Sequence, residues 1–346
     1  MSENSLHCPT SVDELDDVIS RPDQDLIARF DQLEGDCLVL GAGGKMGYHL
    51  ARMLQKVNLK NRNPGKVIAV SRFTNPQAQA RFEKDAITTI RADLGDQKSV
   101  ISLPDARNVF FLAGIKFGTS NHPDLLWQMN QEMPLRVAQR FSDSKIVAMS
   151  TGCVYAFSDA ESGGSKETDR LSPPGEYAKS CIAREQAFER VATNDGTAVT
   201  IVRLNYSIDL RYGVLLDIAK AIQKNEPIDL STGYVNVIWQ RDAISQILRC
   251  LMLTTSPARI INVTGSETLS VRWIAERFAE KMRRPVTFVG TESSKCWLSN
   301  NSQARARFGE PLVSVEQMID WVFDWLSRDM PTLSKPTQFQ IRDGNY

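Results

Sequence analysis

The sequence has few histidines, no paired cysteines, no excess of one charge and no long apolar run. Its three histidines, His7, His49 and His122, lie far apart, and its six cysteines include no C-x-x-C pair. This spacing argues against a zinc site and a disulfide framework, so we expect no metal and reduced, mostly buried thiols. An acid–base catalyst therefore has to be sought among residue types other than histidine.

Charges of the two signs balance, with 41 Lys and Arg against 41 Asp and Glu. A balanced chain has no general attraction for a polyelectrolyte, so we expect no nucleic acid partner. The longest apolar runs, such as 67–70 and 109–113, are strand-sized and fall far short of the ~20 residues of a membrane helix. Residues 1–12 lack the basic and apolar regions of a signal peptide. We expect no membrane association and a cytoplasmic location.

What the sequence does contain is a regular alternation of apolar runs and amphipathic stretches. This alternation is typical of an α/β protein, and it predicts a Rossmann-type doubly wound parallel sheet with a smaller C-terminal substrate lobe and an N-terminal helical extension. The predicted strands are 37–40, 67–70, 87–90, 109–113, 146–149, 199–204, 235–238, 259–263 and 286–289. The predicted helices are 46–56, 76–84, 124–141, 177–192, 214–223, 243–253, 271–282 and 315–326.

The chain divides into four predicted parts. They are a helical extension (1–35), a dinucleotide-binding domain (36–204), a substrate-binding lobe interleaved with the sheet (205–327) and an irregular tail (328–346). In the extension, Ser11 and Glu14 have the spacing of a capping box for a helix through Ile19. A second helix follows Pro22 and stops at Gly35. We expect this helical pair to pack on the main domain and to carry no chemistry.

A glycine-rich turn, G-A-G-G-K-M-G at 41–47, follows the first predicted strand and opens a helix. Such a turn exposes backbone N–H groups and a helix N-terminus, which bind a dinucleotide pyrophosphate. Its glycines are spaced G-x-x-G-x-x-G; G-x-G-x-x-G and Walker A patterns both fail at Met46. The alternative is a tight turn that merely uses glycine. The candidate cofactor contacts are Gly41, Gly44, Lys45, Met46 and Gly47.

The residues after the second strand discriminate between NAD and NADP. An acidic residue there binds the ribose hydroxyl of NAD, whereas an arginine accommodates the phosphate of NADP. This strand runs into Ser71 and Arg72 and offers no carboxylate. A hydroxyl and a guanidinium suit a phosphate, so NADP(H) is favoured. NAD(H) remains the alternative, because Arg72 could instead stack on the adenine or point to solvent.

Over about residues 36–326, the sequence resembles the extended short-chain dehydrogenase/reductase family, the NAD(P)-dependent epimerase/dehydratase group. R-A-D-L at 91–94 resembles the segment after the third strand, and V-F-F-L-A-G at 109–114 resembles the fourth strand with its small-residue turn. S-T-G-C-V-Y at 150–155 resembles the S-S-x-x-V-Y-G stretch, and N-V-T-G at 262–265 matches the C-terminal pattern.

The resemblance implies a set of site residues. Thr151 falls at the catalytic Ser/Thr position, Tyr177 at the catalytic tyrosine, and Asp93 at the residue that binds the adenine amino group. The other positions implied to contact the cofactor are Leu94, Leu112, Ala113, Gly114, Lys116, Asn130, Tyr177 and Cys181.

The sequence departs from this family at the Tyr-x-x-x-Lys pair, because Cys181 stands four residues after Tyr177. Lys179 cannot replace the lysine, since it lies roughly 200° around the helix from the tyrosine. Oxidation of an alcohol needs the phenolate and suffers more from the loss than reduction, which uses the neutral phenol. We therefore expect the reductive direction to be favoured. One hypothesis has Lys116 restoring part of the charge; a solvated loop lysine or a substrate-phosphate contact is the alternative.

The resemblance implies an NAD(P)(H)-dependent oxidoreductase or epimerase acting on a sugar, sugar acid or sugar nucleotide, with Tyr177 as acid/base and Thr151 as donor to the substrate oxygen. The missing lysine leaves an alternative, a non-catalytic NADP(H)-binding regulator or scaffold. A homodimer through helices 124–141 and 177–192 is also implied. Candidate substrate-lobe residues are Asn205, Arg211, Tyr212, Asn236, Trp239, Gln240, Arg241 and Trp297, among which the two arginines are candidates to hold a carboxylate or diphosphate.

Overall fold

The computed structural model describes residues 7–115 and 123–342. Its centre is a seven-stranded sheet with the order β12-β7-β5-β4-β1-β2-β3, in which every neighbouring pair is parallel. The strands are β1 (Cys37–Leu40), β2 (Val67–Ser71), β3 (Thr88–Arg91), β4 (Asn108–Phe111), β5 (Lys145–Thr151), β7 (Val199–Leu204) and β12 (Arg259–Val263). The predicted fold class is confirmed.

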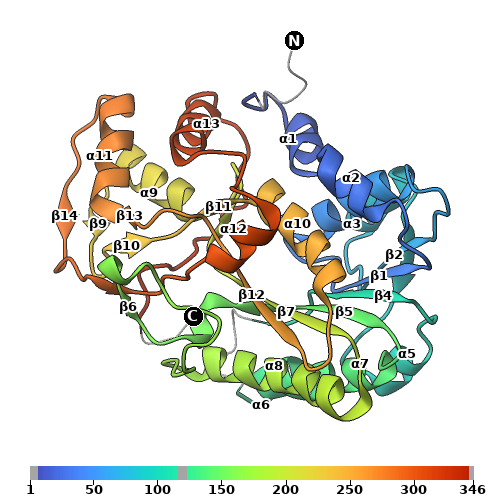
Figure 1. Cartoon of the computed structure of the whole chain (residues 1–346). Helices are drawn as coiled ribbons and strands as arrows, with labels where there is room; N and C mark the ends of the chain where they lie inside the picture. Colours follow the sequence, from blue (N-terminus) through green and yellow to red (C-terminus); the bar gives the residue numbers. More distant parts are fainter. Residues whose placement is uncertain (1–6, 116–122, 343–346) are drawn as a thin grey trace.

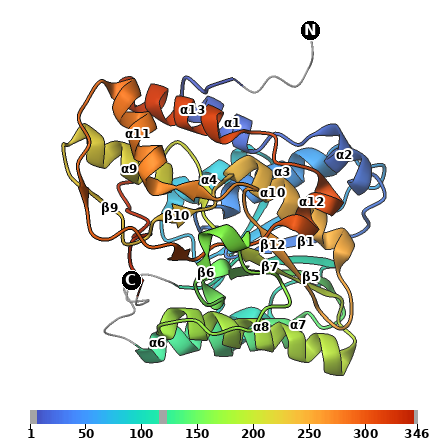
Figure 2. The ribbon, with the colours of Figure 1, turned by 60° about the vertical axis from the view of Figure 1, so that its left-hand side comes forward.

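Helices cover both faces of this sheet (Figures 1 and 2). One face carries α5 (Gln97–Ile101), α7 (Met133–Arg140) and α8 (Glu176–Asp195), and the other carries α3 (Gly47–Asn58) and α10 (Gln240–Arg249). Because both faces are covered, β1 is buried along its whole length. This burial explains why its sequence is a continuous apolar run rather than an alternating one. From β1 the chain adds β2 and β3 on one side of the sheet and then β4 and β5 on the other. The carboxyl ends of β1 and β4, where the order of strands switches sides, therefore form a crevice suited to a ligand.

Most predicted elements lie where the hydrophobic pattern places them. Helices α4 (Pro76–Lys84), α9 (Val214–Gln223) and α11 (Val271–Met282) have the predicted bounds, and α13 (Val315–Ser327) differs by one residue. The chain is helical where a helix was predicted over 124–141, but a π-helical turn divides this helix. The chain there forms α6 (Pro123–Trp127), a π-helical turn (Gln128–Glu132) and α7.

The substrate lobe consists of helices and two-residue strands. The strand predicted over 235–238 is wrong, because β10 (Tyr234–Val235) pairs with β13 (Leu269–Ser270) whereas β11 (Ile238–Trp239) pairs with β8 (Ser207–Ile208). The remaining small pairs are β14 (Phe288–Val289) with β9 (Ile228–Asp229) and β15 (Lys295–Cys296) with β6 (Ser158–Asp159); α12 (Ser302–Phe308) was not predicted. Strand β12 leaves this lobe and joins the central sheet beside β7.

The N-terminal extension forms α1 (Val12–Ile19) and α2 (Gln24–Phe30). The hydroxyl of Ser11 accepts from the backbone N of Glu14 at 3.1 Å. The Glu14 carboxylate bonds Thr10 instead of the backbone of Ser11, so only half of the predicted capping box is present. Leu15 and Phe30 are buried in the main core, which confirms that the extension packs on the rest of the chain.

Residues 328–342 of the tail form no helix or strand, and they lie against the substrate lobe. The backbone N and the hydroxyl of Thr337 both donate to Oδ2 of Asp217, at 2.7 and 2.6 Å, and Phe339 is buried. Among residues 7–115 and 123–342, no helix combines the length and apolar character needed to cross a membrane.

Candidate functional site

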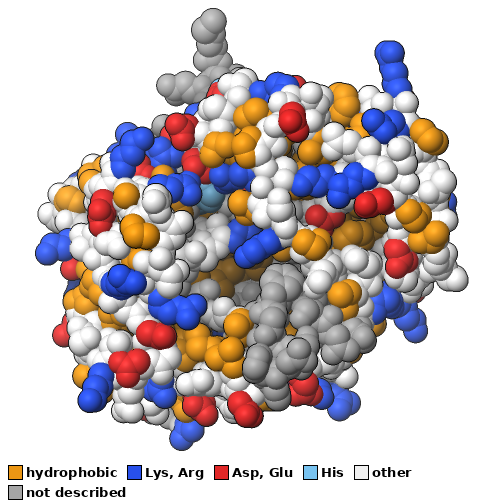
Figure 3. Space-filling view, turned by 180° about the vertical axis from the view of Figure 1, so that it is seen from behind, with side chains coloured by type: hydrophobic (Ala, Val, Ile, Leu, Met, Phe, Trp, Pro, Cys, Tyr) orange, Lys and Arg blue, Asp and Glu red, His pale blue; other side chains and the backbone are white. Residues whose placement is uncertain are grey.

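Two cavities lie at the carboxyl ends of the central strands and share Gly41, Gly44 and Leu112. The first, which we call the nucleotide cavity, has a volume of about 350 Å³, and its lining includes Ser71, Arg72, Asp93, Leu94, Ala113 and Gly114. The second, the reaction cavity, has a volume of about 330 Å³, and its lining includes Lys45, Met46, Gly47, Thr151, Cys153 and Tyr177. Seen from behind, the surface of the molecule is hollowed near its centre (Figure 3).

The glycine-rich turn forms the junction of the two cavities. Gly41 has a φ of +82°, and a Cβ there would lie 2.6 Å from the backbone N of Ala113. Helix α3 starts at Gly47 without a side-chain capping bond, so N–H groups of its first turn are free of an intrahelical partner. This cradle fits the pyrophosphate of a dinucleotide.

The end of the nucleotide cavity predicted to take the adenosine carries Ser71 and Arg72 at the end of β2, where the sequence has no acidic residue. Arg72 is exposed, and its carbonyl accepts from Nε of Arg91 at 3.0 Å. Asp93 is exposed in the same cavity, and its Oδ1 accepts from the backbone N of Gly95 at 2.9 Å. The residues predicted for the adenosine half therefore do lie together.

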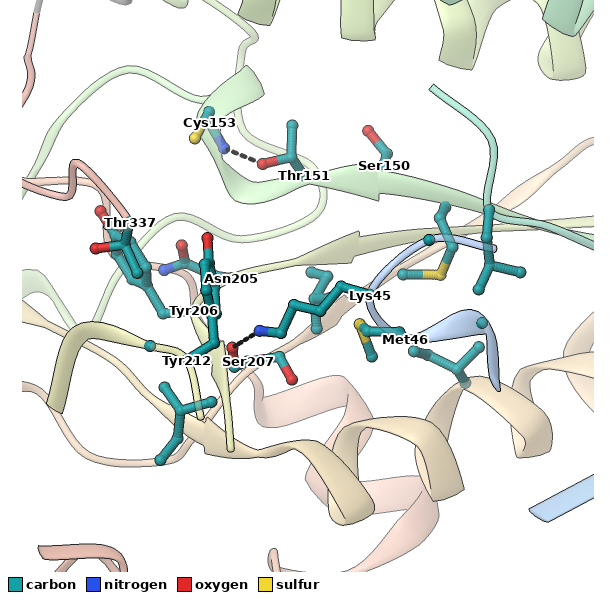
Figure 4. Close-up of a pocket in the computed structure, with 18 of the residues that line it drawn as sticks. Lys45, Met46, Ser150, Thr151, Cys153, Asn205, Tyr206, Ser207, Tyr212 and Thr337 are labelled. Carbon is teal, nitrogen blue, oxygen red and sulfur yellow. Dashed lines mark hydrogen bonds between the residues drawn. The ribbon is translucent and has the colours of Figure 1, made fainter. Parts of the chain in front are cut away.

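The two predicted catalytic residues line the reaction cavity. Thr151 ends β5, and its Oγ1 accepts from the backbone N of Cys153 at 3.2 Å (Figure 4). Tyr177 lies in the first turn of α8. Burial raises the pKa of its phenol well above the ordinary value, Cys181 and Cys153 raise it further, and the charge of Arg184 lowers it in part. The phenol is consequently neutral near pH 7.

A buried network fixes the end of β5 against α8. Ser150 donates from its hydroxyl to Oε1 of Glu185 at 2.5 Å. Nη2 of Arg203 lies 2.6 Å from Oε2 of the same carboxylate, and both charged side chains are 2 % exposed. Nη1 of Arg203 also donates to the hydroxyl of Tyr155 at 2.8 Å. Since Ser150 adjoins Thr151, this network holds the backbone that carries Thr151 in place.

Two of the described residues predicted to contact the cofactor, Cys181 and Asn130, do not line either cavity. Cys181 and Asn130 are both fully buried, and burial raises the pKa of the Cys181 thiol. Asn130 lies in the π-helical turn, where its amide accepts from the backbone N of Ile115 at 3.1 Å and donates to that residue's O at 2.9 Å. Both side chains are thus part of the wall behind the cavities. Lys116, with its predicted approach to Tyr177, lies outside the described residues.

Lys45, from the glycine-rich turn, points toward the substrate lobe (Figure 4). Its Nζ lies 3.5 Å from the centre of the Tyr212 ring and donates to the carbonyl O of Ser207 at 3.3 Å. Burial lowers the pKa of this lysine to about 8.

Sequence reasoning missed two further residues of the reaction cavity. Tyr206, just after β7, has a φ of +40°, which is uncommon outside glycine. Thr337 reaches the cavity from the tail (Figure 4). No local pattern signals either position.

The predicted anion-binding role of Arg211 and Arg241 is wrong, since internal carboxylates already occupy both guanidinium groups. Nη1 of Arg211 lies 3.0 Å from Oδ1 of Asp16 in α1, and Nη1 of Arg241 lies 3.1 Å from Oδ1 of Asp242. Through Asp16, the N-terminal extension takes part in a buried charge network.

Among the candidate substrate-lobe residues, the lining of the reaction cavity includes Asn205 and Tyr212.

The strand order, the glycine cradle and the shared cavities define a dinucleotide-binding fold of the extended short-chain dehydrogenase/reductase class. The sequence model of the NAD dependent epimerase/dehydratase family matches residues 37–208. Over that range the chain belongs to this family. The predictions of the family and of an enzyme of this kind are confirmed, whereas no curated protein matches the sequence.

Several solved structures share the fold over 85 % of this chain. Pal from Bacillus thuringiensis is 17 % identical with a TM-score of 0.69, and 99 % of that chain is covered. UDP-glucuronic acid 4-epimerase from Bacillus cereus, in complex with NAD, is 18 % identical with a TM-score of 0.69 and 99 % covered. DesIV, a dTDP-glucose 4,6-dehydratase from Streptomyces venezuelae with NAD bound, is 17 % identical with a TM-score of 0.70 and 97 % covered.

Proposed function

We propose that this protein is an NAD(P)(H)-dependent oxidoreductase or epimerase that acts on a sugar, sugar acid or sugar nucleotide. The observation that carries this proposal is the position of Thr151 and Tyr177, which line one cavity together with the glycine-rich turn. A bound nicotinamide nucleotide would donate or take up the hydride. Thr151 would donate its hydroxyl proton to the substrate oxygen while its own oxygen accepts from Cys153.

The state of the Tyr177 phenol supports the reductive direction. Its pKa is raised well above the ordinary value, so it holds a proton near neutral pH and is suited to donate it to a carbonyl oxygen. Removing a proton from an alcohol needs the phenolate, which burial disfavours. An epimerase that works through oxidation and re-reduction would be slowest at its oxidative step.

Two features support the cofactor and substrate class. Ser71 and Arg72 favour the ribose phosphate of NADP(H), although two of the similar structures described above carry NAD. The reaction cavity offers the amide of Asn205 and the aromatic ring of Tyr212, groups that bind hydroxyls and sugar faces. UDP-glucuronic acid and dTDP-glucose appear in the names of two relatives, and we extend that substrate class to this chain as part of the proposal.

The second candidate function is that of an NADP(H)-binding regulator or scaffold without catalysis. The observation that favours it is Cys181, a buried thiol at the position where the family has its lysine. Single-turnover mixing separates the two. Protein with bound NADPH is mixed with 4-keto sugar nucleotides, and protein with bound NADP⁺ is mixed with UDP-glucuronic acid, UDP-glucose or dTDP-glucose, while nicotinamide absorbance is recorded.

For the enzyme, at least one substrate changes the absorbance, and Y177F slows the change by a factor of about 10² or more. Tight nucleotide binding without any absorbance change would favour the regulator. Absence of nucleotide binding would contradict both functions.

A homodimer and a cytoplasmic location stay predictions. In α7, Met133 and Val137 are fully buried within the chain itself, as is Phe141 just beyond the helix. These residues therefore do not form the outward apolar face that pairing through 124–141 was expected to use; Leu125, which is 38 % exposed, remains accessible. Light scattering at micromolar concentration tests the dimer, and a monomeric mass would reject it.

A further inference from the structure

Arg184 is a buried cation that makes no ion pair with any residue in the part of the chain that the structure describes. Arg184 is only 8 % exposed. Nη1 donates to the carbonyl O of Met149 at 3.2 Å, and Nη2 donates to Oδ1 of Asn130 at 2.5 Å. Its Nε is buried and has no hydrogen-bond partner among the described residues. Burying an unpaired charge is costly, so this guanidinium calls for an explanation.

Helix geometry brings Arg184 to the face of α8 that carries the catalytic tyrosine. It stands seven residues after Tyr177 and three after Cys181. Seven residues at 3.6 per turn leave it only about 20° from the tyrosine around the axis. Side chains on a helix lean toward its N-terminus. The guanidinium therefore extends back over Cys181 in the direction of Tyr177.

The contacts of the guanidinium lie at the wall between the two cavities. Met149 lines the reaction cavity, and Gly114 lines the nucleotide cavity. A Cβ on Gly114 would collide with Nη2 of Arg184. The guanidinium therefore occupies the space that a side chain at residue 114 would need. Asn130 holds this end of the side chain, and its amide is itself held by Ser180 at 2.9 Å and by the backbone of Ile115.

We propose that Arg184 is a positioning residue that supplies Tyr177 with the positive charge missing at residue 181. The inference rests on the proposed function, in which the phenol is the acid/base. In this arrangement the cation of the Tyr-x-x-x-Lys pair is moved one turn along α8 and is held by Asn130.

The electrostatics of the site agree with this arrangement. Among the described residues, the titratable groups that act on the phenol include Cys181 and Arg184 from α8 and Cys153 from the turn after β5. The two thiols raise the pKa of Tyr177, and Arg184 lowers it. The same guanidinium lowers the pKa of Cys181 against the effect of burial.

The test measures the ionisation of residue 177 directly in the ligand-free protein. A fluorinated tyrosine, whose phenol is more acidic, is incorporated at position 177, and its ¹⁹F resonance is followed as the pH is raised. The proteins compared are the parent, R184Q, R184K and R190Q. Arg190 is an exposed arginine of the same helix and serves as the matched control.

We expect R184Q to raise the pKa of the fluorotyrosine by at least one unit, a tenfold change in its ionisation constant. R184K should stay within half a unit of the parent, and R190Q should not differ from it. An unchanged pKa in R184Q, or an R184K value equal to that of R184Q, would overturn the proposal.

A second variant keeps the proposal testable if R184Q does not fold. C181K/R184A returns the charge to the family's position, and we expect its phenol pKa to lie at or below that of the parent; a value one unit higher would count against the proposal. Because these titrations contain no nucleotide, they are independent of whether the protein binds NADP(H) or turns over a sugar. Failure of the proposed function and failure of this inference are thereby distinguished.

Discussion

The ammonium of Lys45 lies 3.5 Å from the centre of the Tyr212 ring, so the glycine-rich turn of the first βα unit touches the loop that starts the substrate lobe. The same ammonium donates to the carbonyl O of Ser207, 162 residues away in sequence. A cation on the turn that is predicted to cradle a pyrophosphate also faces the reaction cavity. Its charge should therefore contribute to binding of an anionic ligand.

Binding of NADPH should weaken between pH 7 and pH 9. Burial lowers the pKa of Lys45 to about 8, so the ammonium is charged below that pH and loses its charge as the pH rises through it. K45M should weaken binding at pH 7 by about tenfold, about 1.4 kcal/mol, and flatten the pH dependence. Fluorescence titration measures both effects. K60M, which removes an exposed lysine just beyond α3, is the control; equal slopes in K45M and the parent would contradict the role of Lys45.

NADP(H) should bind at least tenfold tighter than NAD(H), about 1.4 kcal/mol. The reason is that Ser71 and Arg72 offer hydrogen-bond donors at the end of β2, where the sequence has no acidic residue. R72A should remove this preference by weakening NADP(H) alone, and R190A should leave it intact. Calorimetry on the nucleotide-free parent, R72A and R190A proteins gives the six dissociation constants. Equal affinities of the parent protein for NADP(H) and NAD(H) would contradict this assignment.

Removing the carboxylate of Asp16 should destabilise the whole chain. Burial by itself raises the pKa of Asp16, but the hydrogen bond from His49 and the charges of Arg211 and Arg81 outweigh it and lower the pKa to about 2. Breaking a buried pair of this kind costs about 3 kcal/mol. We expect D16N to lower the free energy of unfolding by about that amount at pH 7, measured by urea denaturation.

The pH dependence of this effect follows from the lowered pKa. The stabilisation by Asp16 is fully present above its unfolded pKa of 3.8 and is lost as the pH falls toward 2. The difference in the free energy of unfolding between D16N and the parent should therefore become smaller as the pH falls from 3.8 toward 2. D13N, which changes an exposed carboxylate of the same helix, should have little effect. A D16N protein as stable as D13N at pH 7 would show that the network contributes nothing.

The tail should loosen when Asp217 is replaced. Both bonds from Thr337 end on this carboxylate, so D217A removes the attachment of the segment that reaches the reaction cavity. Local opening exposes a backbone to proteolysis, and we expect chymotrypsin to cut after the buried Phe339 roughly fivefold faster or more. Mass spectrometry of the fragments measures the rate. D195A is the control on an exposed carboxylate; identical cleavage in both variants would reject the attachment.

The sequence by itself determined the sheet and the chemical outline of the site. Strands such as β7 and β12, and helices such as α9 and α11, follow local hydrophobic periodicity, which is why their predicted bounds match. The glycine-rich turn, Thr151 and Tyr177 lie at the ends of such elements, and the carboxyl ends of parallel strands meet at one edge of a sheet. Their assembly around one cavity was therefore predictable.

Tertiary structure alone decided which charged side chains serve the site. Arg211 was a reasonable anion-binding candidate until folding placed Asp16 of the extension against it. Arg184 looked like an ordinary helix residue, although its seven-residue spacing from Tyr177 is visible in the sequence. Its proposed role depends on the bond to Asn130 and on the lack of a carboxylate partner among residues 7–115 and 123–342. Such pairings join residues far apart in the chain, and periodicity within one helix or strand carries no information about what packs against it.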